Sequence, residues 1–218
     1  MKKPIILILL MLMGGFGFAQ GLRINTYAGY VFPDRFDNYY SSNSYAQGQI
    51  QDGFRWGVGL EYAIPGNRAI ELQYKRQDTT APTTYRDPSI GGGGLNTANF
   101  DVGINWIMLN FTNYIPVNET VEPFLGGGLG MGIFDVRNPD NGRTNNATKF
   151  AWNIRGGSNF WVAENVAIRI QASLFSAVQS MGGGLYFGTG GAGAGVTTFS
   201  TMYQFGFDGG LVFRLPGK

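Results

Sequence analysis

Few side chains in this chain could carry out chemistry, and most of those are carboxylates set among apolar residues. The 218 residues include no histidine and no cysteine, which removes Ser-His and Cys-His nucleophilic pairs and most transition-metal sites. Glu61 and Glu71 are an example of a carboxylate pair that a short turn could bring together for acid–base catalysis. Basic residues also lie near both in the sequence, which favours ion pairing. We therefore predict no catalytic residue, no cofactor and no metal ion.

Glycine motifs suggest a second kind of chemistry, which is phosphate binding. Gly188, Gly190 and Gly193 match the G-x-G-x-x-G spacing of dinucleotide-binding loops, and Asp208 follows about 20 residues later, as in that motif. No helical pattern follows these glycines, and Asp208 falls within a strand pattern. The glycines at 188–193, like those at 91–94, therefore indicate loops rather than phosphate sites.

The charged residues must be positioned by strands, because apolar residues alternate with small or charged ones along most of the chain. Phe54, Trp56 and Leu60, for example, alternate with Arg55 and Glu61. A period of two is typical of an extended strand with two unlike faces. The pattern predicts eight strands, near residues 22–32, 54–64, 70–75, 100–111, 121–134, 150–162, 166–174 and 203–215.

The connections between these strands alternate between short and long. Pro65–Asn67, Pro116–Glu119 and Ala163–Asn165 have the composition of tight turns. The other connections are long, and polar or rich in glycine, at residues 33–52, 78–98, 137–148 and 179–198. Short turns at one end and long loops at the other predict an up-and-down meander. The alternation shifts phase before Leu109, so we also expect a bulge within 106–108.

Two kinds of barrel fit this meander, and they differ in which face of each strand points outward. In a soluble barrel of lipocalin type the apolar face lines a dry interior, whereas in a transmembrane barrel it meets lipid. The apolar face carries rings such as Trp56, Trp106 and Trp152, which are too bulky for the interior of eight strands. Turning Arg55 or Arg155 toward lipid would cost about 2–4 kcal/mol each. We therefore predict an all-β fold, a closed eight-stranded antiparallel transmembrane β-barrel.

The charged residues of the opposite face should then fill the interior together with glycine. Unpaired charges there would be costly, so we expect a connected ionic network across the lumen. The residues predicted to form it are Arg55, Glu61, Glu71, Lys75, Asp101, Glu122, Arg155, Arg169, Asp208 and Arg214.

The first residues have the composition of a secretory signal peptide. Lys2 and Lys3 precede an apolar run, and Gly17-Phe18-Ala19 has the small-x-small pattern of a cleavage site. We expect residues 1–19 to be removed and residues 20–218 to form one β-barrel domain. The whole chain has 16 Lys and Arg against 14 Asp and Glu, so loss of two lysines leaves a neutral protein. A neutral protein gives no support to nucleic-acid binding.

The strand pattern resembles that of a known family. The segments "VEPFLGGGLGMG" (121–132) and "YQFGFDGGLVFRL" (203–215), with the leader, tight turns and long loops, look like the OmpA/OmpX-like outer-membrane β-barrels of Gram-negative bacteria. The resemblance implies an outer-membrane location, insertion by the outer-membrane assembly machinery, and contact with outer-membrane lipid and lipopolysaccharide. It also implies a structural, adhesion or accessory role.

The first long loop is a candidate for binding a protein partner. Tyr39, Tyr40 and Tyr45 lie among serine and asparagine, a composition typical of binding loops, although tyrosines also occur at membrane interfaces. The leading functional hypothesis is an interaction protein acting through its loops. The alternative is a narrow channel or a transporter of small hydrophobic solutes, with an enzyme in third place.

Overall fold

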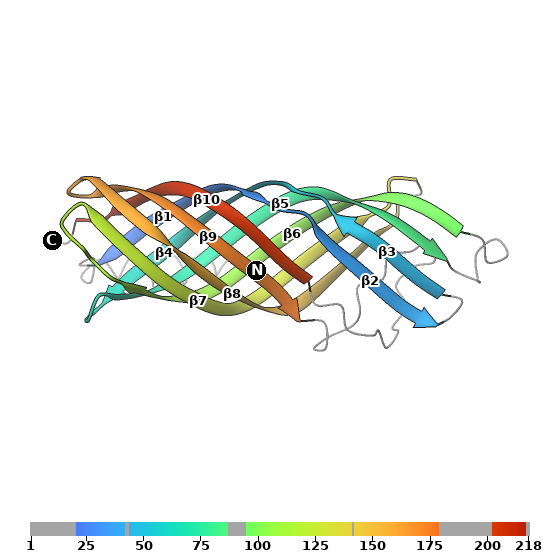
Figure 1. Cartoon of the computed structure of the whole chain (residues 1–218), viewed down its shortest axis with the longest axis horizontal. Coiled ribbons are helices and arrows are strands. Elements are labelled where there is room, and N and C mark those ends of the chain that lie inside the picture. The colour runs from blue at the N-terminus through green and yellow to red at the C-terminus, as the bar shows by residue number, and fades with distance from the viewer. Residues whose placement is uncertain (1–20, 42–43, 87–94, 141, 179–201, 217–218) are drawn as a thin grey trace, which may run out of the picture.

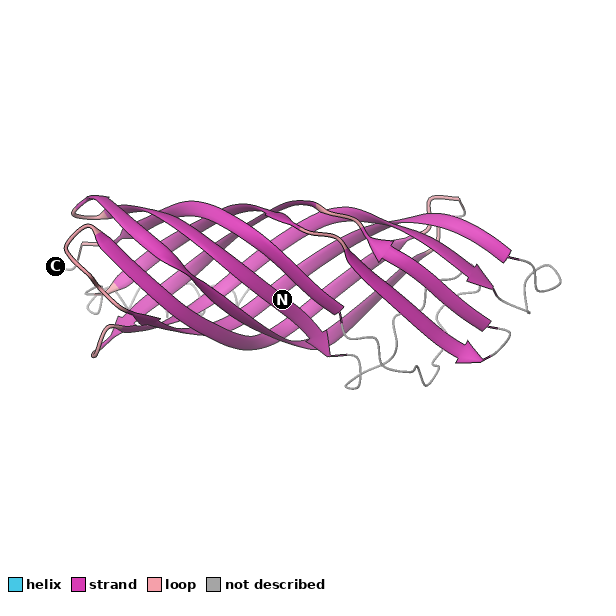
Figure 2. Cartoon of the chain, in the orientation of Figure 1, coloured by secondary structure: helices cyan, strands magenta, loops and turns pink. Residues whose placement is uncertain are grey.

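The computed structural model describes residues 21–41, 44–86, 95–140, 142–178 and 202–216, which form strands and their connections. The predicted signal peptide and the glycines at 91–94 and 188–193 lie outside these residues. Figure 2 shows that the described regular elements are strands. No helix among the described residues is long and apolar enough to span a membrane. The strands are β1 (Leu22–Val31), β2 (Asp34–Ser41), β3 (Ser44–Ile50), β4 (Gly53–Ile64), β5 (Arg68–Arg86), β6 (Leu95–Tyr114), β7 (Val121–Arg137), β8 (Thr144–Ala163), β9 (Val166–Val178) and β10 (Met202–Arg214).

Eight of these strands close into a ring (Figure 1). The order is β4, β1, β10, β9, β8, β7, β6 and β5, and β5 pairs again with β4. All of these pairs are antiparallel. The predicted antiparallel ring of eight strands is therefore confirmed. Closure gives every strand of the ring two hydrogen-bonded neighbours, which leaves no open edge around it.

The remaining two strands, β2 and β3, correct the prediction of a long first loop. They form an antiparallel hairpin, and β3 also pairs with the end of β5. The hairpin extends beyond the ring (Figure 1). The second long connection is also shorter than predicted, because β5 continues to Arg86 and β6 begins at Leu95. These segments carry many polar residues, although Ile50, Ala81, Tyr85 and Ala98 at their inner positions are buried in an apolar cluster.

The three tight turns lie together at the other end of the ring, as predicted. They join β4 to β5, β6 to β7 and β8 to β9. Gly66 and Asn67 in the first of them have φ values of 86° and 57°, a region that glycine and asparagine adopt at the least cost. The described chain also ends on this side, as Figure 1 shows. The two ends of the ring therefore differ in construction, with turns at one and strand extensions at the other.

The expected bulge at residues 106–108 is absent. β6 pairs with β5 without a shift, from Asn113 opposite Arg68 to Leu95 opposite Arg86. Phe100 and Trp106 lie on the inner face with exposed fractions of 2% and 0%, so the prediction that this apolar set faces outward is wrong. The change of phase instead reflects a strand with apolar residues on its inner face near one end and on its outer face near the other.

Candidate functional site

The two faces of the ring have opposite chemistry over most of its length. On β4, Phe54 and Leu60 are 61% and 47% exposed, whereas Arg55 and Glu61, the residues that follow them, are completely buried. The same contrast holds on β8 and β9, where isoleucines face outward and arginines inward. Apolar residues pointing out and ions pointing in are typical of a barrel that stands in lipid rather than in water.

One group of interior charges is centred on Asp208. Its carboxylate accepts hydrogen bonds from Arg55 Nη2 at 3.0 Å and Lys75 Nζ at 2.7 Å. Gln171 and Ser173 donate to it as well, both at 3.1 Å. All three charged side chains are completely buried. β4, β5 and β10 supply the charges, because their inward positions lie at the same level of the ring.

A second group contains Glu61 and Glu71. Arg155 forms an ion pair with Glu71, and Arg169 lies 3.5 Å from Glu61. Asn25 joins the two carboxylates, because its side-chain amide donates to Glu61 at 3.0 Å and to Glu71 at 2.8 Å. Both carboxylates are therefore occupied by cations and amides, which is a structural arrangement rather than that of a free acid and base.

Two tyrosines link the charges of this second group to one another. Tyr27 donates to Glu71 at 2.5 Å and accepts from Arg169 at 2.9 Å. Tyr114 donates to Glu61 at 2.7 Å and accepts from Arg169 at 2.9 Å. Each hydroxyl group thus bridges a carboxylate and the Arg169 guanidinium across the ring. Neither tyrosine was predicted to belong to the ionic network, although Tyr27 falls on the inward phase of its strand.

Arg23 is a further interior cation that the prediction missed. It lies 3.2 Å from Glu122 and 3.5 Å from Glu61, near the end with the tight turns. Its inward phase on β1 was the signal that could have identified it. We call the two groups, together with Arg23 and Glu122, the interior network. Its charged members are Arg23, Arg55, Glu61, Glu71, Lys75, Glu122, Arg155, Arg169 and Asp208.

Two predicted members lie outside the interior network, and this corrects the prediction. Asp101 is exposed on the outer face of β6, because the inner face at its level is apolar. Arg214 follows the inward phase but is the last residue of β10, so it reaches past the rim of the ring. There it donates to the Glu164 carbonyl at 3.1 Å and lies 4.0 Å over the Trp161 ring.

A layer of apolar side chains lies inside the ring on the side of the strand extensions. Trp106 packs against Phe134 and Phe175, with ring centroids 5.7 and 5.2 Å apart. Phe175 also lies 4.8 Å from the Arg55 guanidinium, so the apolar layer and the interior network are in contact. The prediction of a polar lumen therefore holds for only part of the interior, because rings of this size do fit where glycines of neighbouring strands leave space.

Gly132 provides such space beside the apolar layer. A side chain there would begin 2.9 Å from Trp106 and 3.0 Å from Phe134, which is closer than side chains pack. Glycines on the inner face of β7 thus make room for rings supplied by other strands. The alternation of glycine in this strand predicted a crowded interior, but not which residues would fill it.

The candidate loop tyrosines lie in strands rather than in a loop. Tyr39 of β2 stands opposite Tyr45 of β3, and Tyr40 falls where the register of the hairpin shifts. Asp34 at the start of the hairpin accepts a hydrogen bond from the Tyr203 backbone at 2.9 Å, which fastens the hairpin to β10. Burial raises the pKa of the Asp34 carboxyl above its ordinary value.

The described residues contain no group of three or more acidic side chains arranged to hold a metal ion. The chemistry available to the ring is therefore that of ion pairs, hydrogen bonds and apolar contact. The charged groups of the interior network are paired with one another.

Comparison with known proteins identifies the fold. No family model and no curated protein matches the sequence. Among solved structures, Neisserial surface protein A (NspA) matches with a TM-score of 0.56 and 14% identity, over 89% of this chain and 97% of that one. The outer membrane protein OprG from Pseudomonas aeruginosa matches with a TM-score of 0.53 and 13% identity, over 88% and 95%.

These likenesses cover almost the whole of each chain and rest on shape rather than sequence. They agree with the closed antiparallel ring, its apolar outer face and its buried charges. The protein has the fold of the small outer-membrane β-barrel proteins of Gram-negative bacteria, as the resemblance in its sequence predicted.

Proposed function

We propose that this protein is an integral outer-membrane β-barrel with a closed interior, acting as a structural or interaction protein through its outward surfaces. In this proposal residues 1–19 direct export and are removed, and residues 20–218 form the transmembrane domain. The outer-membrane assembly machinery inserts it, and outer-membrane lipid surrounds it. It has no catalytic residue and no cofactor.

The dimensions of the apolar outer face support a membrane-spanning role. On β10, Tyr203, Phe205 and Phe207 are 49%, 42% and 51% exposed, and apolar residues continue to Phe213. From 203 to 213, at about 3.3 Å per residue and a tilt of about 40°, the height is about 25 Å. The apolar band of outer-membrane barrels is also about 25 Å tall. In water so much exposed apolar surface would cause aggregation.

The observation that carries the proposal is the complete burial of the interior charges. Arg55, Lys75, Glu61 and Glu71 are 0% exposed, whereas the walls of a water-filled channel would be accessible to water. Beside them the interior is filled by Trp106 and its neighbouring rings. An eight-stranded barrel is just wide enough for side chains to fill its interior. A solid interior leaves the outer surface and the strand extensions as the places where the protein can act.

Conductance measurements test the closed interior. We expect the purified protein in planar lipid bilayers to give no steady current, because ions would have to displace paired buried charges. Heat-modifiable migration on gels serves as the control that the reconstituted protein is folded. Steady, size-selective currents would overturn the proposal and support the alternative of a narrow channel or a small-solute transporter.

A charge placed on the outer face tests the membrane orientation. Leu129 is 59% exposed in the apolar belt, and Leu129→Arg is expected to lower the free energy of unfolding in lipid vesicles by about 2–4 kcal/mol. Asn146→Arg, on the polar part of the outer face of β8, is the matched control and should change it by less than about 0.5 kcal/mol. Equal small effects of both substitutions would mean that the belt does not meet lipid.

The β2–β3 hairpin is the part of the proposal that concerns a protein partner. It stands beyond the ring, and its strands carry Tyr39, Tyr40 and Tyr45. Tyrosine provides contact area at a low cost in entropy. Crosslinking on intact cells followed by purification should recover a neighbour from the wild-type protein, and a protein with alanine at these three positions should lose it.

A further inference from the structure

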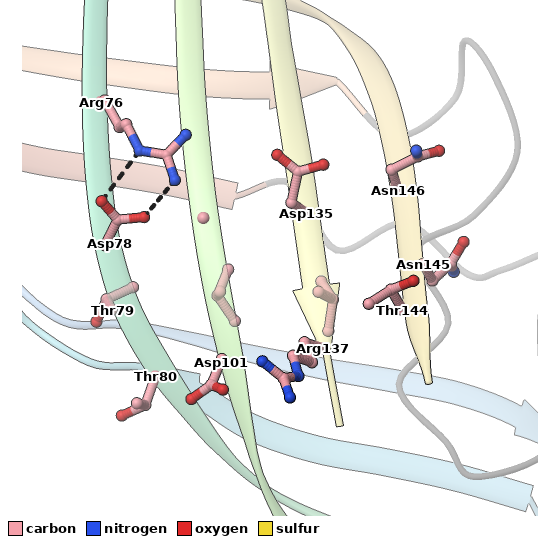
Figure 3. Close-up of a pocket in the computed structure, with 13 residues that line it drawn as sticks. Arg76, Asp78, Thr79, Thr80, Asp101, Asp135, Arg137, Thr144, Asn145 and Asn146 are labelled. Carbon is pink, nitrogen blue, oxygen red and sulfur yellow. Dashed lines mark hydrogen bonds and ion pairs between the residues drawn. The ribbon is translucent and has the colours of Figure 1, made fainter. Parts of the chain in front are cut away.

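The outer face of the ring is hollowed next to the strand extensions, where the lining residues are mostly polar. A cavity of about 690 Å³ opens there across β5, β6, β7 and β8. Figure 3 shows its charged side chains on neighbouring strands. We call this cavity the polar notch and define it by six of its lining residues, which are Arg76, Asp78, Asp101, Gly103, Asp135 and Arg137. Its volume lies within the range of small-molecule sites, about 300–1,000 Å³.

Strand register explains why the surface is hollow at this point. Gly103 of β6 lies opposite Asp78 of β5 on one side and opposite Asp135 of β7 on the other. A side chain at Gly103 would begin 3.5 Å from Arg76 Nη2 and from Asp78 Oδ1, and 3.7 Å from Asp135 Cβ. These are ordinary contact distances, so the missing side chain leaves a space that a ligand group can occupy without any shift of the backbone.

The groups around Gly103 are partly tied to one another and partly free. Arg76 and Asp78 form a two-bonded pair, with distances of 3.0 and 2.6 Å, drawn as dashed lines in Figure 3. Asn105 donates to Asp135 at 3.2 Å. Asp101 and Arg137 lie opposite each other in the register. Neither of these two side chains has an ion pair or hydrogen bond with another described residue, so both can bond a ligand.

The mixture of charges indicates which ligands the polar notch can take. Its two guanidinium groups donate hydrogen bonds and its three carboxylates accept them. The excess of one negative charge disfavours a simple anion, and an apolar solute would leave the charges without partners. Sugar hydroxyls both donate and accept, so neighbouring hydroxyl groups can bond to both kinds of side chain at once.

The position of the polar notch indicates where the sugar comes from. The six residues that define the polar notch lie at outward positions of β5, β6 and β7, so the notch belongs to the outer face of the ring. Four residues further along each of the four strands, about 13 Å away, the outward side chains are apolar or aromatic. They are Tyr74, Ile107, Met131 and Phe150, which lie next to one another in the register. A ligand in the polar notch therefore lies just above the apolar belt, at the level of lipid headgroups.

We propose that the polar notch binds the sugar headgroup of a membrane glycolipid, an inference that rests on the outer-membrane location proposed above. Asp101, Asp135 and Arg137 bond the sugar hydroxyls, and Gly103 provides the space for one sugar ring. The lipid chains of the same molecule lie against the apolar belt. Specific binding of one lipid is thereby assigned to one face of the ring, whereas other lipids surround it.

Filling the polar notch tests this inference. Fluorescent lipopolysaccharide with a core oligosaccharide is titrated against the folded protein in detergent micelles, and binding is followed by anisotropy. Gly103→Leu fills the cavity without replacing any charged residue and should weaken binding at least tenfold. Gly209→Leu is the matched control, because Gly209 is exposed on the outer face of β10 and an added side chain there would begin 3.9 Å or more from its nearest neighbours, at an ordinary contact distance. It should leave the affinity within twofold.

Further arms of the experiment identify the chemistry that is recognised. Asp101→Ala is a second variant, to be used if Gly103→Leu fails to fold. Asp101 lies at an exposed position, and its replacement should also weaken binding. Phosphatidylethanolamine, which carries no sugar, should bind the wild type and Gly103→Leu equally. Equal binding of the core-bearing lipid to wild type and folded Gly103→Leu would overturn the inference. So would displacement by inorganic phosphate, or free oligosaccharide binding as tightly as the intact lipid.

The outcomes also separate this inference from the proposed function. A protein that conducts steadily in bilayers contradicts the closed interior, whatever the polar notch binds. A folded, non-conducting protein whose Gly103→Leu variant binds the glycolipid normally contradicts only the polar notch.

Discussion

Asp208→Asn is expected to lower the free energy of unfolding by about 3–5 kcal/mol, the cost of breaking a buried ion pair by removing one partner. The substitution preserves shape but removes the negative charge that neutralises Arg55 and Lys75. Both cations are completely buried and bond directly to Asp208. No solvent reaches them, so their charges would remain uncompensated in a medium of low dielectric constant.

Urea unfolding in lipid vesicles, followed by tryptophan fluorescence, measures this effect. Asp101→Asn is the matched control, since Asp101 is exposed on the outer face and forms no ion pair with a described residue. The control should change stability by less than about 0.5 kcal/mol. Adding Arg55→Met and Lys75→Met to Asp208→Asn should restore much of the loss, because no buried charge is then left unpaired. A loss below about 1 kcal/mol for Asp208→Asn would contradict the proposed role of this carboxylate.

Arg155→Leu is expected to lower the free energy of unfolding by a similar amount, about 3–5 kcal/mol. Here the group left without its partner is a buried anion rather than a buried cation. Arg155 pairs with Glu71 and donates to Thr112 at 2.6 Å. Without the guanidinium, Glu71 keeps the hydroxyl of Tyr27 and the amide of Asn25 as donors, but it loses its directly paired cation. The carboxylate would then carry a buried charge held only by neutral groups and by more distant cations.

The same unfolding measurement applies, with Arg76→Leu as control. Arg76 also forms an ion pair, with Asp78, but the two side chains are 35% and 64% exposed, and such pairs contribute about 0–1 kcal/mol. Introducing Glu71→Gln into the Arg155→Leu protein should recover part of the stability, since the amide carries no charge. Unfolding of Arg155→Leu at the same urea concentration as wild type would show that Glu71 does not depend on this cation.

Much of the ring could be predicted from the alternation alone. On β4 every second residue is large and apolar, and its neighbours are glycine or charged, so both the strand and its outward face could be assigned. Arg55, Glu61, Glu71, Arg155 and Asp208 were placed in the interior for the same reason, and the structure brings each of them to a partner there. The three tight turns were equally clear, because their compositions are specific.

β6 shows where this reasoning fails. Its two faces are both apolar over part of their length, so the period of two reveals two faces but not which of them points inward. Phe100 and Trp106 were expected outside and Asp101 inside, and the structure places them the other way round. The hairpin of β2 and β3 was missed because its strands carry few apolar residues and add to a sheet through their backbones.

The amino-acid pattern alone was enough to assign the class of fold, the number of strands in the ring and the outward face of most of them. The period of two and the cost of charge in lipid are local properties, and each strand carries them independently. Only the tertiary structure decided which charges pair, where the interior changes from ionic to apolar, and that Gly103 lies between Asp78 and Asp135. These features depend on the stagger between neighbouring strands, which sets the level of every residue in the closed ring and which no single strand encodes.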